Sequence, residues 1–180
     1  MKVLKFVLFI FLSFSLSCKE EPIVDTSQND ISVSTFYLIR HAEKDRSNPD
    51  DTDPELNQKG LGRAMHWAEI LQNAELDAIY STDYNRTSMT AAPTSVKMNI
   101  DVQYYDPRII DFDQFKADNV NKNVLIVGHS NTTPDFVNKL INEEKYPEID
   151  DSENGTLFIV QFVNGIPTVN KLIFNCNCPE

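Results

Sequence analysis

The sequence is poor in positive charge and in histidine, and it lacks a long apolar run. Its 180 residues hold 16 lysines and arginines against 27 aspartates and glutamates, and the formal net charge is −11 at pH 7. A phosphate backbone needs a basic surface, so this balance argues against a nucleic-acid partner. The main apolar stretch, Val7 to Leu16, is too short for a comfortable membrane span. The length suits one domain with a sizeable core.

The N-terminus is typical of an export signal. Lys2 and Lys5 precede the apolar stretch, and Ser17 and Cys18 follow it. The stretch resembles a lipoprotein signal peptide, in which the cysteine is lipidated; an ordinary secretory signal cut nearby is the alternative. The "CKEE" sequence is similar to an acidic signal that sends some Gram-negative lipoproteins to the cell surface. We therefore expect an exported protein that its lipid anchors to the outer membrane, on the periplasmic side or at the cell surface.

This interpretation divides the chain into four parts. We expect a signal peptide at 1–17, the lipidated cysteine and a flexible tether at 18–34, one folded domain at 35–175 and a short tail at 176–180. The tail contains Cys176 and Cys178. A disulfide across one intervening residue is strained, and two thiolates make a poor metal site, so we expect no catalytic role for them.

Within the domain, strand-like and helix-like segments alternate. The pattern predicts strands at 35–40, 77–81, 101–105, 123–128, 155–163 and 167–174, and helices at 57–74, 85–96, 109–119 and 133–144. Pro93 is expected to bend or end its helix. This alternation predicts a single-domain α/β fold, with a mainly parallel sheet covered by helices on both faces.

Two of the three histidines end predicted strands. Arg40-His41 follows the first strand, and Gly128-His129 follows the fourth. In parallel α/β sheets, ligands bind beyond the carboxyl ends of the strands, so both imidazoles are expected in one pocket. His66 lies inside a predicted helix, and we expect no chemistry from it.

Cations gather at the same strand ends. Arg86 begins the helix after the second strand, and Lys44 and Arg46 lie in the loop after His41. The natural ligand for two guanidiniums, two imidazoles and a helix N-terminus is a phosphoryl group. A neutral imidazole can attack phosphorus, and the phosphohistidine is then hydrolysed without a metal. The acidic loop 45–55 is either plain surface or a rim that filters substrates by charge.

Four motifs carry a resemblance to a known family. They are "LIRHAEK", "LNQKGLGRA", "IYSTDYNRT…TA" and "VLIVGHSNTTP", and they cover roughly Thr35 to Leu140. In order and spacing they resemble the histidine phosphatase superfamily, also called the phosphoglycerate mutase-like family, and in particular its short phosphohistidine-phosphatase-like members. Two positions depart from the family pattern. Ala42 replaces a glycine, and Ser130 stands where one branch has an aspartate.

The resemblance implies a role for each site residue. His41 is the phosphorylated nucleophile, and Arg40, Arg86 and a protonated His129 bind the phosphoryl group. Asp106 lies nearest the place of the general acid in the mutase-like branch. Lys44 and Asn131 are further candidates for substrate binding.

Two functions remain open on this basis. The first is a metal-independent phosphatase, without a cofactor, that hydrolyses phosphomonoesters or phosphohistidine through a phosphohistidine on His41. The second is a lipoprotein of the same fold that binds phosphate or a phosphorylated ligand without turnover. Sugar phosphates, nucleotides, polyphosphate and phosphoproteins all offer the same group, so the residues do not choose among small phosphorylated substrates. They do not fix the oligomeric state either.

Overall fold

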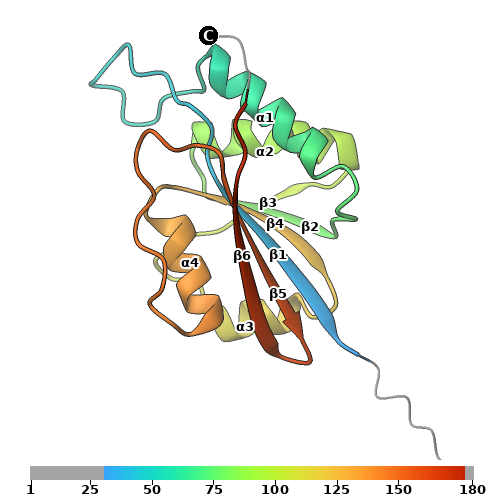
Figure 1. The fold of residues 1–180 in the computed structure, drawn as a ribbon. Helices are drawn as coiled ribbons and strands as arrows, with labels where there is room; N and C mark the ends of the chain where they lie inside the picture. The colour runs from blue at the N-terminus through green and yellow to red at the C-terminus, as the bar shows by residue number, and fades with distance from the viewer. Residues whose placement is uncertain (1–30, 177–180) are drawn as a thin grey trace, which may run out of the picture. The chain divides into compact units, whose positions relative to one another are not determined.

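The computed structural model describes residues 31–176, which contain six strands and four helices (Figure 1). The strands are β1 (Val33–Arg40), β2 (Ala78–Ser81), β3 (Val102–Tyr104), β4 (Asn123–Gly128), β5 (Thr156–Val163) and β6 (Ile166–Ile173). The helices are α1 (Gln58–Ile70), α2 (Asn85–Met98), α3 (Phe112–Asp118) and α4 (Thr132–Ile141). Each predicted segment therefore forms an element of the predicted type.

Several expectations concern residues outside this range. The signal peptide, the lipid on Cys18 and most of the tether lie outside the described residues, as do residues 177–180. The strand β1 starts two residues earlier than the expected domain boundary, because Val33 and Ser34 pair with Val163 and Phe162 of β5. Cys176 takes part in a disulfide, and its partner lies outside the described residues. Among the described residues, no helix is long and apolar enough to span a membrane.

The six strands form one sheet in the order β3-β2-β4-β1-β5-β6. The pairs β2–β3, β2–β4 and β1–β4 are parallel, whereas β5 and β6 are added antiparallel at one side. Asn164 and Gly165 make the tight turn between these last strands, with φ of 51° and 81°. The predicted mainly parallel sheet is confirmed.

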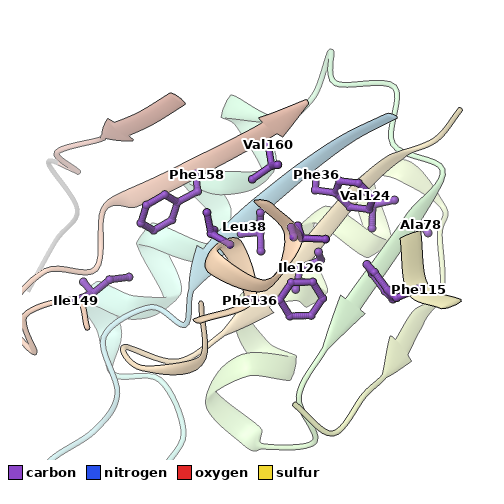
Figure 2. Packing of buried hydrophobic residues seen from close by; sticks show 12 residues of the cluster. Phe36, Leu38, Ala78, Phe115, Val124, Ile126, Phe136, Ile149, Phe158 and Val160 are labelled. Carbon is purple, nitrogen blue, oxygen red and sulfur yellow. The ribbon is translucent and has the colours of Figure 1, made fainter. Parts of the chain in front are cut away.

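Helices cover both faces of the sheet, as predicted. Figure 1 shows α1 and α2 on one face and α3 and α4 on the other. Side chains of β1 alternate between the two layers: Phe36 and Leu38 pack with Phe136 of α4, while Ile39 packs with Trp67 of α1. Figure 2 shows the first of these layers, in which aromatic and branched side chains gather on the α3 and α4 side of the central strands.

Two residues in or beside the helices have local effects. Asn57 caps α1, because its side chain accepts a hydrogen bond from the Gly60 amide at 2.9 Å. Pro93, however, does not end its helix, which continues to Met98. A proline removes one helical hydrogen bond, and the buried face of α2, which includes Thr90 and Thr94, packs firmly enough to offset that loss.

Candidate active site

The two strand-end histidines lie side by side. In the β1–β4 pairing Arg40 is opposite Gly128, and the His41 amide donates a 2.8 Å hydrogen bond to the Gly128 carbonyl. The register therefore fixes the two following side chains at one edge of the sheet. The imidazole centroids of His41 and His129 are 5.4 Å apart, with the rings inclined at 65°.

The imidazole of His41 is held in the form that a nucleophile requires. The side chain is 4% exposed, and Nδ1 lies 2.7 Å from the Ala42 carbonyl oxygen. A carbonyl only accepts, so Nδ1 carries the proton and the lone pair is on Nε2. Burial lowers the pKa of His41 to about 3, with smaller contributions from Arg40, His129 and Arg86 in the same direction. The ring is therefore neutral over the physiological pH range.

His129 is also neutral. Burial lowers its pKa to about 4, with smaller contributions from the charges of Arg86, Arg40 and Lys44. The protonated His129 expected from the sequence concerns the phosphoryl-bound site and stays a prediction, because nearby cations disfavour a further positive charge without an anion. Nε2 lies 2.9 Å from the Thr82 hydroxyl, which itself donates to Thr87, so Nε2 is the donor. A bound phosphoryl dianion would favour protonation of Nδ1.

Arg40 is buried and tightly held. It is 1% exposed, and Nη1 donates to the carbonyls of Asp150, Asp151 and Glu153 at 2.9, 3.1 and 3.1 Å. Nη2 donates to the Asp151 carboxylate. Nε has no hydrogen-bond partner within the described residues. Burying a guanidinium N–H without a hydrogen-bond partner costs free energy. This indicates that a ligand accepts the remaining hydrogen bond of Arg40.

Arg86 reaches the same pocket from the first turn of α2. Its Nη1 lies 3.2 Å from Oδ1 of Asp53, and its guanidinium stacks 4.4 Å from the ring centre of Tyr84. Asp53 also accepts from the Asn85 amide at 3.0 and 3.1 Å, so one carboxylate caps α2 and orients the arginine. The ring of Tyr84 in turn meets His129 edge-on at 5.0 Å.

These groups face one pocket of about 830 Å³ beyond the strand ends. All seven residues that the sequence assigned to the site line it: Arg40, His41, Lys44, Arg86, Asp106, His129 and Asn131. The sequence thus identified which residues meet, although the roles assigned to them stay predictions.

Asp106 has an environment unlike that of a resting general acid. Arg108 donates to it from Nε at 2.9 Å and from Nη2 at 2.6 Å. These hydrogen bonds lower the pKa of Asp106 to about 2. A carboxyl group that protonates a leaving alkoxide needs a raised pKa instead, so Arg108 must release Asp106 before it can act in that role.

Further residues brace the nucleophile, and sequence reasoning did not assign them. The Asn154 amide donates to the His41 carbonyl at 3.0 Å. The Thr90 hydroxyl accepts from the Ala42 amide at 2.9 Å and donates to the Arg86 carbonyl at 2.7 Å, which ties the segment after β1 to the first turn of α2. The repeated threonine in "NRTSMTA" was the only signal for this contact.

The loop after His41 is fixed to α1 by a buried ion pair. Glu43 receives hydrogen bonds from Nε and Nη2 of Arg63, the shortest at 2.8 Å, and the pair is largely buried. Gly60 lies against the backbone of Glu43, where a Cβ atom would collide with the carbonyl oxygen. This close approach explains the glycine in the "LNQKGLGRA" segment.

The site contains no evident metal centre. Among residues 31–176, no three histidine, cysteine, aspartate or glutamate side chains come together to hold a metal ion.

Comparison with known proteins agrees with this geometry. Residues 36–113 match the family model described as histidine phosphatase superfamily (branch 1). Phosphoserine phosphatase 1 of Hydrogenobacter thermophilus is 37% identical over 83 residues, which are 43% of this chain and 38% of that protein. The chain thus spans well under half the length of this curated relative.

Solved structures extend the likeness across the sheet. The protein histidine phosphatase SixA in complex with tungstate has a TM-score of 0.63 at 17% identity, covering 77% of this chain and 96% of that one. Phosphoglycerate mutase from Bacillus anthracis has a TM-score of 0.60 at 15% identity, covering 78% and 92%. At such identities these likenesses establish the fold. With the match over residues 36–113 and the ordered motifs, the chain is similar to the histidine phosphatase superfamily in sequence and shares the fold of these structures.

Proposed function

We propose that this protein is a phosphatase that hydrolyses phosphomonoesters through a phosphohistidine on His41, without a metal. One observation carries the proposal. A neutral, buried imidazole has its Nε2 lone pair open to a pocket, beside an arginine whose Nε–H has no partner within the described residues. This combination offers a nucleophile and an unfilled place for a phosphoryl oxygen.

The reaction has two displacements. Nε2 of His41 attacks phosphorus, a bond from nitrogen to phosphorus forms, and the bond to the ester oxygen breaks. Arg40, Arg86 and His129 surround the equatorial oxygens, and the charge of the phosphoryl group favours a protonated His129. Water then attacks phosphorus, the bond from Nε2 to phosphorus breaks, and the proton that water loses returns to the Asp106 carboxylate. Phosphate leaves, and His41 is again neutral.

Asp106 is the proposed proton donor to the leaving alkoxide in the first displacement. Arg108 also lines the pocket, and its side chain is 84% exposed, so it is able to turn toward a bound phosphoryl group. Loss of Arg108 and the approach of the dianion would both raise the pKa of Asp106. The carboxyl group would then be protonated only when a substrate is bound.

The relatives support phosphatase chemistry without identifying the substrate. One is named a phosphoserine phosphatase, and the fold is shared with a protein histidine phosphatase that was solved with tungstate, an oxyanion. A phosphate ester or a phosphohistidine is therefore a reasonable first substrate for this chain. The comparisons give no support to the alternative of a binding protein without turnover.

The decisive experiment uses purified protein from residue 31 onward and nitrophenyl phosphate. His41→Ala is expected to lower kcat by several orders of magnitude, because the variant lacks the proposed nucleophile. Rapid quenching should trap acid-labile, alkali-stable phosphate on wild-type protein. His66→Ala is the matched control, since His66 is half-exposed on α1, and its one ion pair among residues 31–176 is with Glu69 at 3.9 Å. Full activity of His41→Ala would falsify the mechanism.

We also propose that the protein is exported and anchored by lipid on Cys18, on the grounds of its N-terminal sequence alone. Mass spectrometry of the N-terminal peptide from membranes tests this. A mature N-terminus that is unmodified and begins after Cys18 would exclude the anchor.

A further inference from the structure

A second hollow adjoins the phosphoryl pocket. Its volume is about 250 Å³, and it shares two lining residues, Lys44 and Asp151, with the larger pocket. Arg46 and Lys59 also line it, as does Glu43. Three cations and two acids therefore surround a space that opens beside the proposed nucleophile.

The acids of this hollow are already neutralised. Glu43 is paired with Arg63 at 2.8 Å, and Asp151 is shared between Arg40 and Arg46. The ammonium groups of Lys44 and Lys59 have no comparable partner: among residues 31–176, neither forms an ion pair, a hydrogen bond or a ring contact. The hollow therefore has a surplus of positive charge.

This surplus is unusual in so acidic a chain. Of the lysines and arginines between residues 31 and 176, Lys97 is the one other member without a polar or ring partner, and it is exposed on α2. Lys44 and Lys59 are instead half-buried residues that line one hollow. An anionic ligand in this hollow would gain charge-assisted hydrogen bonds from two ammonium groups that have no such partner among residues 31–176.

The position of Lys44 connects the hollow to the reaction. It lines both spaces, and its charge acts on the imidazole of His129. A substrate with its phosphoryl group against His41 can therefore extend a second group past Lys44.

We propose that Lys44 and Lys59 form a second anion subsite, which receives a carboxylate or second phosphate of the same substrate. The inference rests on the proposed function, because it takes the phosphoryl group to be at His41. It assigns the preferred substrates to the class of phosphate esters that carry a second anionic group. Arg46 supports the subsite by holding Asp151, whose carboxylate would otherwise repel the ligand.

Phosphoserine and phosphoethanolamine make a matched test, since they differ only by the carboxylate. We expect wild-type protein to prefer phosphoserine by about tenfold in kcat/KM, the range for one charge-assisted hydrogen bond. The acidic protein as a whole repels an added carboxylate, so a preference of this sign must arise locally. Lys44→Gln and Lys59→Gln should each bring the ratio toward one. Lys97→Gln, the matched control, should leave it unchanged.

The outcomes separate this inference from the proposed function. Turnover of both compounds at equal kcat/KM, or a preference that survives both substitutions, would overturn the subsite and leave the phosphatase intact. If neither compound nor nitrophenyl phosphate is hydrolysed, the proposed function fails. Calorimetric binding of the same two compounds then tests the subsite alone. The subsite is supported if wild-type protein binds phosphoserine more tightly than phosphoethanolamine and Lys59→Gln abolishes this difference. Equal or undetectable binding overturns it.

Discussion

The floor and the rim of the pocket are built in opposite ways. The floor consists of Arg40, His41 and His129, which lie at the ends of the central strands β1 and β4; Arg40 and His41 are buried, and His129 is half-buried. The rim contains Asp53, Asp106 and Asp151, whose side chains are 39%, 32% and 64% exposed and come from loops. Burial holds the floor imidazoles neutral, whereas arginine partners lower the pKa of Asp106 and Asp151 at the rim. The proposed reaction thus depends on the rigid packing of the floor. The ion pairs of the rim are exposed, so a bound substrate can rearrange them.

The largest effect we expect at the rim is on Asp106. If Arg108 releases it in the complex, Asp106→Asn should slow alkyl phosphates by roughly 10²-fold, within the usual span for lost acid catalysis. Nitrophenyl phosphate should be nearly unaffected, because nitrophenolate leaves without a proton. Asp83→Asn is the control, since Asp83 lines the same pocket and has no ion pair among the described residues. If Asp106→Asn lowers the turnover of both substrates slightly and equally, Asp106 is not the proton donor.

The floor can be probed through the pH dependence of stability. The folded protein holds His41 neutral with a pKa of about 3, whereas the unfolded chain has an ordinary value near 6.5. Below pH 6.5 the unfolded state therefore binds a proton that the folded state does not, and stability falls until the pH reaches the folded pKa. Between pH 7 and 5, His41 should account for about 2 kcal/mol of that loss, a factor of roughly 30.

Urea unfolding of wild type and His41→Asn at pH 7 and 5 measures this contribution. The variant is expected to lose less stability on acidification than the wild type, by about the amount that one histidine supplies. His66→Asn is the control, because His66 is half-exposed on α1. An unchanged pH dependence in His41→Asn would mean that the floor is more solvated than its burial implies.

The same contrast explains what could be read from the sequence. His41 and His129 follow strong apolar runs, so the α/β alternation alone predicted that they meet at one sheet edge. The rim partners have no comparable signal. Asp151 reaches Arg40 across 111 residues of sequence, and Asn154 reaches His41 across 113. The path of a loop sets such contacts, and a loop has no hydrophobic periodicity from which its path could be predicted.

Other details have the same origin. The lowered pKa of His129 was not predicted, because burial and the charges of nearby cations act only in the folded chain. Pro93 was expected to bend or end its helix from local propensity, and the helix does not end there. Gly60 was visible in the sequence, but the backbone of Glu43 that requires it was not.

The smallest effect we expect is on Asp53, which belongs to the rim and serves the floor. Its carboxylate caps α2 and orients Arg86, so Asp53→Asn should keep the fold and lower kcat/KM about tenfold, since a misplaced arginine loses part of its electrostatic contribution. Asp111→Asn is the matched control. Asp111 caps α3 through the amides of Asp113 and Gln114, without an arginine at a pocket. Both variants should lose about 1 kcal/mol of stability, the usual cost of a helix cap, yet only Asp53→Asn should lose activity. The phosphate inhibition constant adds a second measurement, because freeing Arg86 from its carboxylate makes the pocket more positive. Product phosphate should bind as tightly as before or more tightly, while kcat falls. Equal losses of activity in the two variants would mean that Asp53 acts only as a helix cap and does not orient Arg86.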